Sequence, residues 1–284
     1  MRMTDNPGDE RLKAPGSVAP APARGSAEIG ATPPCSARAR LLTTWPWIAY
    51  VLPLATFMAV GSFEPKPAAV AAGESSLAWQ LPYAAYPLVY ALKIALTTAA
   101  LAWVWPALRA FPRRVSLWSL AVGVVGIFVW VGLWRLQGQL LPFLPETVKG
   151  WLGLGERSAY NPLAELADRP ALAYGFLAIR LFGLTVVIAL AEEIFLRGFL
   201  MRFFVRPDWW KVPFGEVNTA AVVAGTLVPM LMHPAEMLAA AVWFSLVTWL
   251  MIKTRSLWDC VVAHATTNLL LGCYVIWSGQ WTLL

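Results

Sequence analysis

The sequence has little charge and few of the residues that mark soluble catalytic or metal-binding domains. Only 13% of its 284 residues are charged, against about 25% in an ordinary soluble domain. Its three cysteines, Cys35, Cys260 and Cys273, have no CxxC spacing, which excludes a disulfide framework and a zinc knuckle. The sequence has no internal repeat, no Walker motif and no GxGxxG motif. These absences leave a chain without the common signatures of soluble enzymes.

Apolar residues dominate what is there. They make up 58% of the chain, and the mean hydropathy is +0.59. Sixteen tryptophans are typical of membrane interfaces. The net charge of +6 lies in short clusters between apolar runs, so we interpret it as a topology signal rather than a nucleic-acid surface. The sequence predicts a multi-pass membrane protein surrounded by lipid, with no nucleic-acid partner.

The hydropathy pattern predicts an all-α bundle of about seven transmembrane spans. Residues 1–40 are rich in Ala, Pro, Gly and Arg and have no helical period, which predicts a disordered cytoplasmic tail. Residues 41–170 would hold spans one to three and an outer loop, and residues 171–284 the catalytic core. The seven apolar stretches lie at 45–63, 83–105, 115–135, 171–204, 218–234, 235–252 and 256–277.

The lengths of these stretches and the charges between them predict the topology. A bilayer core needs about 20 apolar residues, so the 171–204 helix should be tilted, broken or protruding. The stretches 218–234 and 235–252 are short, and we expect the turn between them to dip into the membrane. The basic clusters alternate along the chain, which predicts a cytoplasmic N-terminus. Residues 136–170 are expected to form an exposed loop with a short amphipathic helix.

Ionisable groups in spanning segments are costly and are therefore candidates for function. Glu193 and Arg197 are four residues apart and can neutralise each other on one helix face. Glu192 is rotated from Glu193 by about 100°, so it stays available for another role. The alternative is a buried Glu193–Arg197 pair with Glu192 reaching the interface.

His233 and His264 are the only histidines, and both lie in apolar segments. Asn268 lies four residues after His264, so the two side chains share a helix face and offer two N–H donors to an oxyanion. Apolar surroundings make a carboxylate a better base, which suits Glu192 to activating water with the help of His233. The pattern predicts hydrolysis without a covalent nucleophile and without a cofactor.

Three further interpretations stay open. Glu192, His233 and His264 could instead hold a zinc ion with a bound water. Lys93 is expected either to pair with a carboxylate or to line a substrate cavity. Asp259 is a second candidate for the cavity, although its place at a helix start also suits an N-terminal cap. An eighth ionisable residue, Arg180, is expected to reach the outer interface.

These residues resemble the motifs of the CAAX prenyl protease and bacteriocin-processing family, the type II CAAX proteases. The matching positions are Glu192-Glu193-xxx-Arg197, His233 and His264-xxx-Asn268, within residues 175–275. The family's second motif is usually FxxxH, and Pro229 stands here in place of the Phe. The resemblance implies a glutamic-type intramembrane endopeptidase with no obligatory metal. Glu192 and His233 would activate water, His264 and Asn268 would form the oxyanion site, and Glu193 with Arg197 would support it.

The first spans add a finer resemblance. Residues 47–65 and 86–93 are similar to the exosortase-associated CAAX protease-related subgroup. That resemblance implies a bacterial inner-membrane protein, a protein or peptide substrate, and partners in an exosortase sorting system. A prenylated substrate is then not expected. The rival hypothesis from another class is a catalytically silent membrane scaffold or immunity partner.

Overall fold

The computed structural model describes residues 36–67, 81–109, 111–152, 154 and 159–284. These residues form helices and turns without a β-strand, which confirms the all-α prediction. The first helix, α1 (Ala37–Thr44), begins inside the segment that we predicted as a tail, because the Ser36 side chain caps it by accepting from the Ala39 N–H. The rest of that predicted tail, residues 1–35, lies outside the described residues.

A helix occupies every one of the seven apolar stretches, but the helices differ in length. Five are long and apolar enough to cross a membrane, and a sixth span arises if α1 and α2 (Ile48–Gly61), which are bent by 96°, are counted as one. The 14-residue α11 (Thr219–Met232) is shorter than a span. The described residues thus provide five or six candidate spans, because a helix of 14 residues reaches only about 21 Å, and the count of about seven stays a prediction. The five long ones are Tyr83–Leu108, Leu117–Phe143, Pro170–Val205, Pro234–Thr254 and Leu257–Ser278. The cytoplasmic N-terminus stays a prediction.

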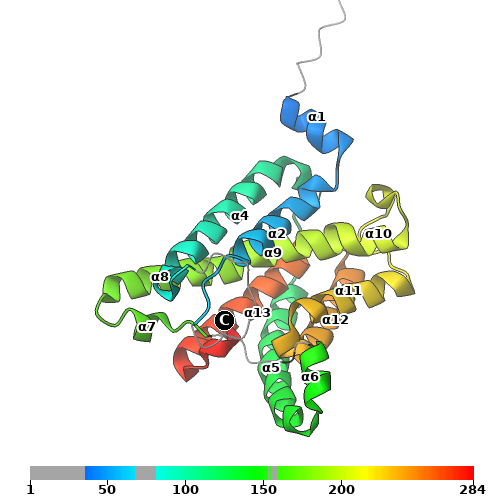
Figure 1. Cartoon of the computed structure of the whole chain (residues 1–284). Coiled ribbons are helices and arrows are strands. Elements are labelled where there is room, and N and C mark those ends of the chain that lie inside the picture. Colours follow the sequence, from blue (N-terminus) through cyan, green and yellow to red (C-terminus); the bar gives the residue numbers. More distant parts are fainter. Residues whose placement is uncertain (1–35, 68–80, 110, 153, 155–158) are drawn as a thin grey trace, which may run out of the picture.

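The fourth apolar stretch forms one helical run of 36 residues, Pro170–Val205. It comprises α8 (Pro170–Phe182), α9 (Ala189–Glu193) and α10 (Met201–Val205), joined by the π-helical segments Gly183–Ile188 and Ile194–Leu200. Figure 1 shows α8, α9 and α10 as one long rod across the molecule. At about 54 Å it exceeds the bilayer core, so it must tilt or protrude. The two π segments flank the paired carboxylates, and such segments often mark functional sites.

Three helices pack closely behind the paired carboxylates: α5 (Leu117–Leu140), α12 (Met237–Thr254) and α13 (Leu257–Ser278). Gly126 of α5 makes the close approach possible, because a Cβ there would lie 2.3 Å from Thr267 Oγ1 and 2.5 Å from Trp243 Nε1. The Thr267 hydroxyl donates to the Gly123 carbonyl at 2.9 Å, and the Trp243 indole donates to Thr267 at 3.1 Å. Small residues of this kind let helix backbones approach each other in membrane proteins.

The long helix α4 (Tyr86–Leu108) packs against α2, and Figure 1 shows the two side by side at one edge of the bundle. The connection predicted as an exposed loop contains the short helices α6 (Glu146–Leu152) and α7 (Pro162–Glu165). Most side chains of α6 are exposed, as expected. Residues 153 and 155–158 of this loop, and 68–80 of an earlier one, lie outside the described residues.

Candidate active site

The predicted catalytic side chains line one cavity of about 700 Å³. Glu192 comes from α9, His233 from the end of α11, and His264 and Asn268 from α13. Figure 1 shows α9, α11 and α13 converging in the middle of the molecule. Four residues that are separated by up to 76 positions in the sequence therefore share one enclosed space.

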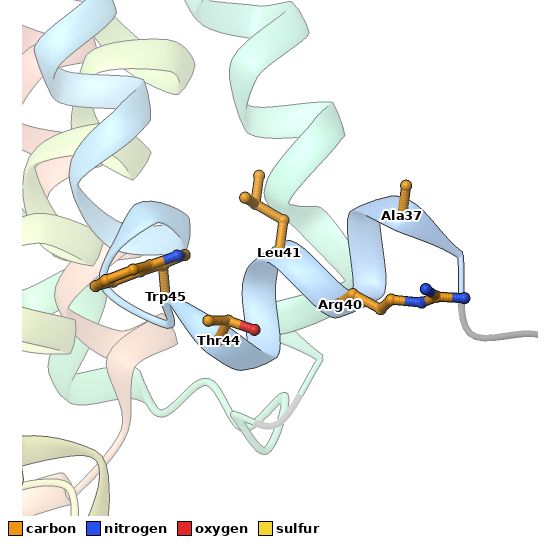
Figure 2. Close-up of a pocket in the computed structure, with 5 residues that line it drawn as sticks. All are labelled: Ala37, Arg40, Leu41, Thr44 and Trp45. Carbon is orange, nitrogen blue, oxygen red and sulfur yellow. The ribbon is translucent and has the colours of Figure 1, made fainter.

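A second pocket, of about 460 Å³, lies beside α1 and does not suit catalysis. Figure 2 shows its five lining residues, Ala37, Arg40, Leu41, Thr44 and Trp45, along α1 and the turn that follows it. It contains no carboxylate and no histidine. We therefore build the candidate site on the cavity around Glu192.

Glu193 is the centre of a fully buried network. Its Oε1 accepts a hydrogen bond from Arg197 Nη1 at 3.1 Å, and neither side chain is exposed. The same Oε1 lies 2.9 Å from His264 Nδ1. Arg197 also donates from Nη2 to the Phe244 carbonyl at 3.1 Å. The predicted Glu193–Arg197 pair is present, and it also orients His264, which spacing along the sequence did not indicate.

Glu192 has a different environment from its neighbour. Glu192 lines the cavity and Glu193 does not, although the Oε2 atom of each carboxylate is buried without a hydrogen-bond partner. His264 Nε2 lies 3.8 Å from Glu192 Oε2, which is beyond hydrogen-bond distance. A buried carboxylate oxygen without a partner costs free energy, so a water or substrate group is needed there. Glu192 does not reach the interface, because its side chain is only 7% exposed.

His233 terminates α11 and is fixed by the helix end. Its Nδ1 lies 2.9 Å from the Pro229 carbonyl, one of the carbonyls that a helix end leaves without an intrahelical partner. A carbonyl only accepts, so Nδ1 carries the proton and Nε2 keeps its lone pair in the neutral ring. Pro234 ends the helix, since the residue before a proline avoids the α conformation. Pro229, the departure from the FxxxH motif, thus supplies the carbonyl that sets the His233 tautomer.

The turn after His233 is held by Gln137, a residue that sequence analysis missed. Gln137 belongs to α5 and is buried. Its amide nitrogen donates to the carbonyls of Ala235 at 2.9 Å and Pro234 at 3.3 Å, and its oxygen accepts from the Leu238 N–H at 2.9 Å. Irregular backbone inside a membrane protein needs such partners. No local pattern points to Gln137, because its partners lie about 100 residues away.

His264 and Asn268 share the cavity face of α13, but each already makes one fixed contact. The Asn268 amide donates to the Leu184 carbonyl at 2.9 Å, which leaves its second N–H for a ligand. The Trp243 ring lies edge-on to His264, with centroids 4.6 Å apart. Trp243 is thus a second residue that the sequence analysis missed, although it holds the His264 ring in place.

The other ionisable candidates have mixed outcomes. Lys93 fulfils both of its expected roles, since it pairs with Glu64 and lines the cavity. Arg180 is 3% exposed, lines the same cavity and donates to the carbonyl of Tyr160, so its guanidinium is buried inside the protein. Asp259 does not line the cavity, which corrects that expectation. Its two oxygens accept from Ser116 N–H at 2.6 Å and Ser116 Oγ at 3.0 Å, and so tie the starts of α13 and α5 together.

The zinc hypothesis has no support from ligand geometry. Within the described ranges, no group of three or more His, Cys, Asp or Glu side chains is placed to hold a metal ion. Glu192 Oε2 and His264 Nε2 lie 3.8 Å apart, and His233 is held through Nδ1 by the Pro229 carbonyl.

Comparison with known proteins supports the motif assignment. Residues 174–270 match the family model described as "Type II CAAX prenyl endopeptidase Rce1-like". No curated protein and no solved structure matches the chain significantly. The matched segment contains the whole set of predicted catalytic and supporting residues, from Glu192 to Asn268. Residues 174–270 of this multi-pass membrane protein are a domain of the Rce1-like type II CAAX prenyl endopeptidase family.

Proposed function

We propose that this protein is an intramembrane endopeptidase that hydrolyses a peptide bond of a membrane-associated protein or peptide. One observation supports it most strongly: a carboxylate oxygen of Glu192, buried and without a hydrogen-bond partner, in a cavity that His233, His264 and Asn268 also line. The peptidase family of residues 174–270 supports the same reaction class.

In this proposal Glu192 and His233 activate the attacking water. The Glu192 carboxylate takes a proton from the water, and the hydroxide attacks the carbonyl carbon of the scissile peptide bond. His233 accepts a hydrogen bond from the water through Nε2, because Nδ1 is engaged with the Pro229 carbonyl. The proton held by Glu192 then passes to the nitrogen of the leaving amine, and the C–N bond breaks.

His264 and Asn268 stabilise the tetrahedral oxyanion in this proposal. Asn268 contributes the N–H that does not bind the Leu184 carbonyl. His264 donates from Nδ1 to Glu193, so only its doubly protonated ring can also donate from Nε2. Donors that are already in place when the charge develops give this kind of stabilisation its effect.

We also propose a cellular setting for this reaction. We place the protein in a bacterial inner membrane with its N-terminus in the cytoplasm. The exosortase-system partners rest on the resemblance of residues 47–65 and 86–93 alone. In that setting we expect the substrate to carry no prenyl group.

Comparing the membrane proteomes of cells that carry the wild type or Glu192→Gln tests the proposal. We expect one membrane protein to stay unprocessed in the Glu192→Gln cells and in His233→Ala cells, while both variants insert and fold. Glu146→Gln is the matched control, since Glu146 lies on the exposed helix α6, pairs with Lys149 and does not line the cavity. Full processing in both site variants would instead favour a silent scaffold. Loss of processing by purified protein on chelation, with recovery on adding zinc, would favour the metal-dependent mechanism.

A further inference from the structure

Basic and acidic side chains both line the cavity around Glu192. The basic ones are Lys66, Lys93 and Arg180, and the acidic ones are Glu64 and Glu192. A water-activating carboxylate does not by itself require a buried arginine in the same cavity. Arg180 therefore needs a separate explanation.

Lys93 is neutralised by the protein itself. Its ammonium group forms an ion pair with Glu64. It also lies 4.2 Å from the centroid of the Phe57 ring and 4.4 Å from that of Tyr90, within the range of cation–π attraction. With a carboxylate and two aromatic faces, Lys93 has little capacity left for a ligand.

Arg180 has no such counter-charge. Its guanidinium makes one hydrogen bond, from Nη1 to the Tyr160 carbonyl at 2.7 Å, and no carboxylate of the described residues lies within 4 Å of it. The rings of Tyr86 and Tyr90 are 6.0 and 5.9 Å away. Burial raises the pKa of Tyr160, so this phenol stays neutral beside Arg180. A buried arginine in a spanning helix is costly and usually has a partner or a function.

The same helix face connects Arg180 to the catalytic carboxylate. Arg180, Leu184, Ile188 and Glu192 are spaced by four residues and all line the cavity. The twelve positions from Arg180 to Glu192 correspond to about 18 Å along the helix. An extended peptide covers that distance with about five residues. Leu184 and Ile188 give the intervening wall an apolar character.

We propose that Arg180 binds a carboxylate of the substrate peptide, about five residues from the bond at Glu192. The planar guanidinium matches a carboxylate in a two-point contact, and its remaining N–H groups are available for it. This inference rests on the proposed peptidase function, because it takes the occupant of the cavity to be a peptide. The carboxylate is either the C-terminus or an acidic side chain, and the chemistry at Arg180 is the same for both.

Binding of short peptides to the full-length Glu192→Gln chain in detergent micelles tests this without turnover. The probes are N-acetyl-Ala-Leu-Ala-Leu-Ala with a free C-terminus, the same peptide as its amide, and the amide with Glu at the last position. Because no hydrolysis is measured, a failure here is distinct from a failure of the proposed function. We expect either carboxylate peptide to bind about 10- to 100-fold more tightly than the plain amide. If only the peptide with the free C-terminus binds more tightly than the plain amide, the carboxylate that Arg180 recognises is the C-terminus.

Arg180→Gln should remove this preference and leave the affinity for the amide unchanged, while Arg180→Lys should keep part of it. Arg135→Gln is the matched control, because Arg135 donates to the Tyr274 hydroxyl and does not line the cavity. If Arg180→Gln does not fold, Leu184→Glu offers a second test. It places a carboxylate one turn from Arg180 and should compete with that of the peptide. Equal binding of acid and amide to the parent chain, or a preference that survives Arg180→Gln or Leu184→Glu, would overturn the proposal.

Discussion

Replacing each of the two adjacent glutamates by glutamine should separate stability from catalysis. Glu193 Oε1 contacts both Arg197 and His264, and all three side chains are almost completely buried. Glu193→Gln keeps the shape but leaves the Arg197 guanidinium without its ion-pair partner. Removing one partner of a buried ion pair costs about 3–5 kcal/mol. We therefore expect Glu193→Gln to lower the free energy of unfolding by that amount.

Glu192→Gln should abolish hydrolysis but leave the stability of the protein nearly unchanged. Glu192 Oε2 makes no hydrogen bond that the substitution would break, and glutamine keeps the size of the side chain. We expect its free energy of unfolding to stay within about 1 kcal/mol of the wild-type value, whereas hydrolysis is lost because water then has no base. The two variants differ by one position in the chain and thus control for each other.

Equilibrium unfolding in mixed detergent–dodecyl sulfate micelles measures the difference. Tryptophan fluorescence is a suitable signal, since Trp243 lies against His264 in the site. A gap of 3 kcal/mol between the two variants corresponds to more than a hundredfold in the folding equilibrium. An equal loss of stability in both variants would refute the division of roles, because it would mean that Glu192 also holds the fold together.

Two more predictions concern the residues that support the site. Gly126→Ala should destabilise the protein by about 1–3 kcal/mol and lower kcat, since its new methyl group would collide with Trp243. Gly132→Ala, on the same helix but with open space around it, should be neutral or stabilising, and similar unfolding curves for the two alanine variants would contradict the close approach. Gln137→Leu should lower kcat by a larger factor than it changes KM, because it releases the turn that positions His233. A wild-type kcat in Gln137→Leu would show that the turn is held without this amide.

The sequence by itself determined the helices and the order of the motifs. Apolar runs placed a helix in every predicted stretch, because a chain in lipid must satisfy its backbone groups internally. Spacing by four residues placed Arg197 beside Glu193, since such neighbours share a helix face. The motif order also identified the peptidase family of residues 174–270. These features depend on residues that are close together in the chain or on fixed patterns of residue types.

Only the tertiary structure decided which polar group meets which. His264 contacts Glu193 across 71 positions, and Asn268 reaches the Leu184 carbonyl across 84. Gln137 gave no signal in the sequence, and Arg180 stood out only by its charge, because the partners of both are set by packing against distant segments. Helical periodicity fixes the direction of a side chain on its own helix but not the neighbour that faces it. That neighbour depends on how closely α5, α12 and α13 approach, which small residues such as Gly126 decide through shape alone.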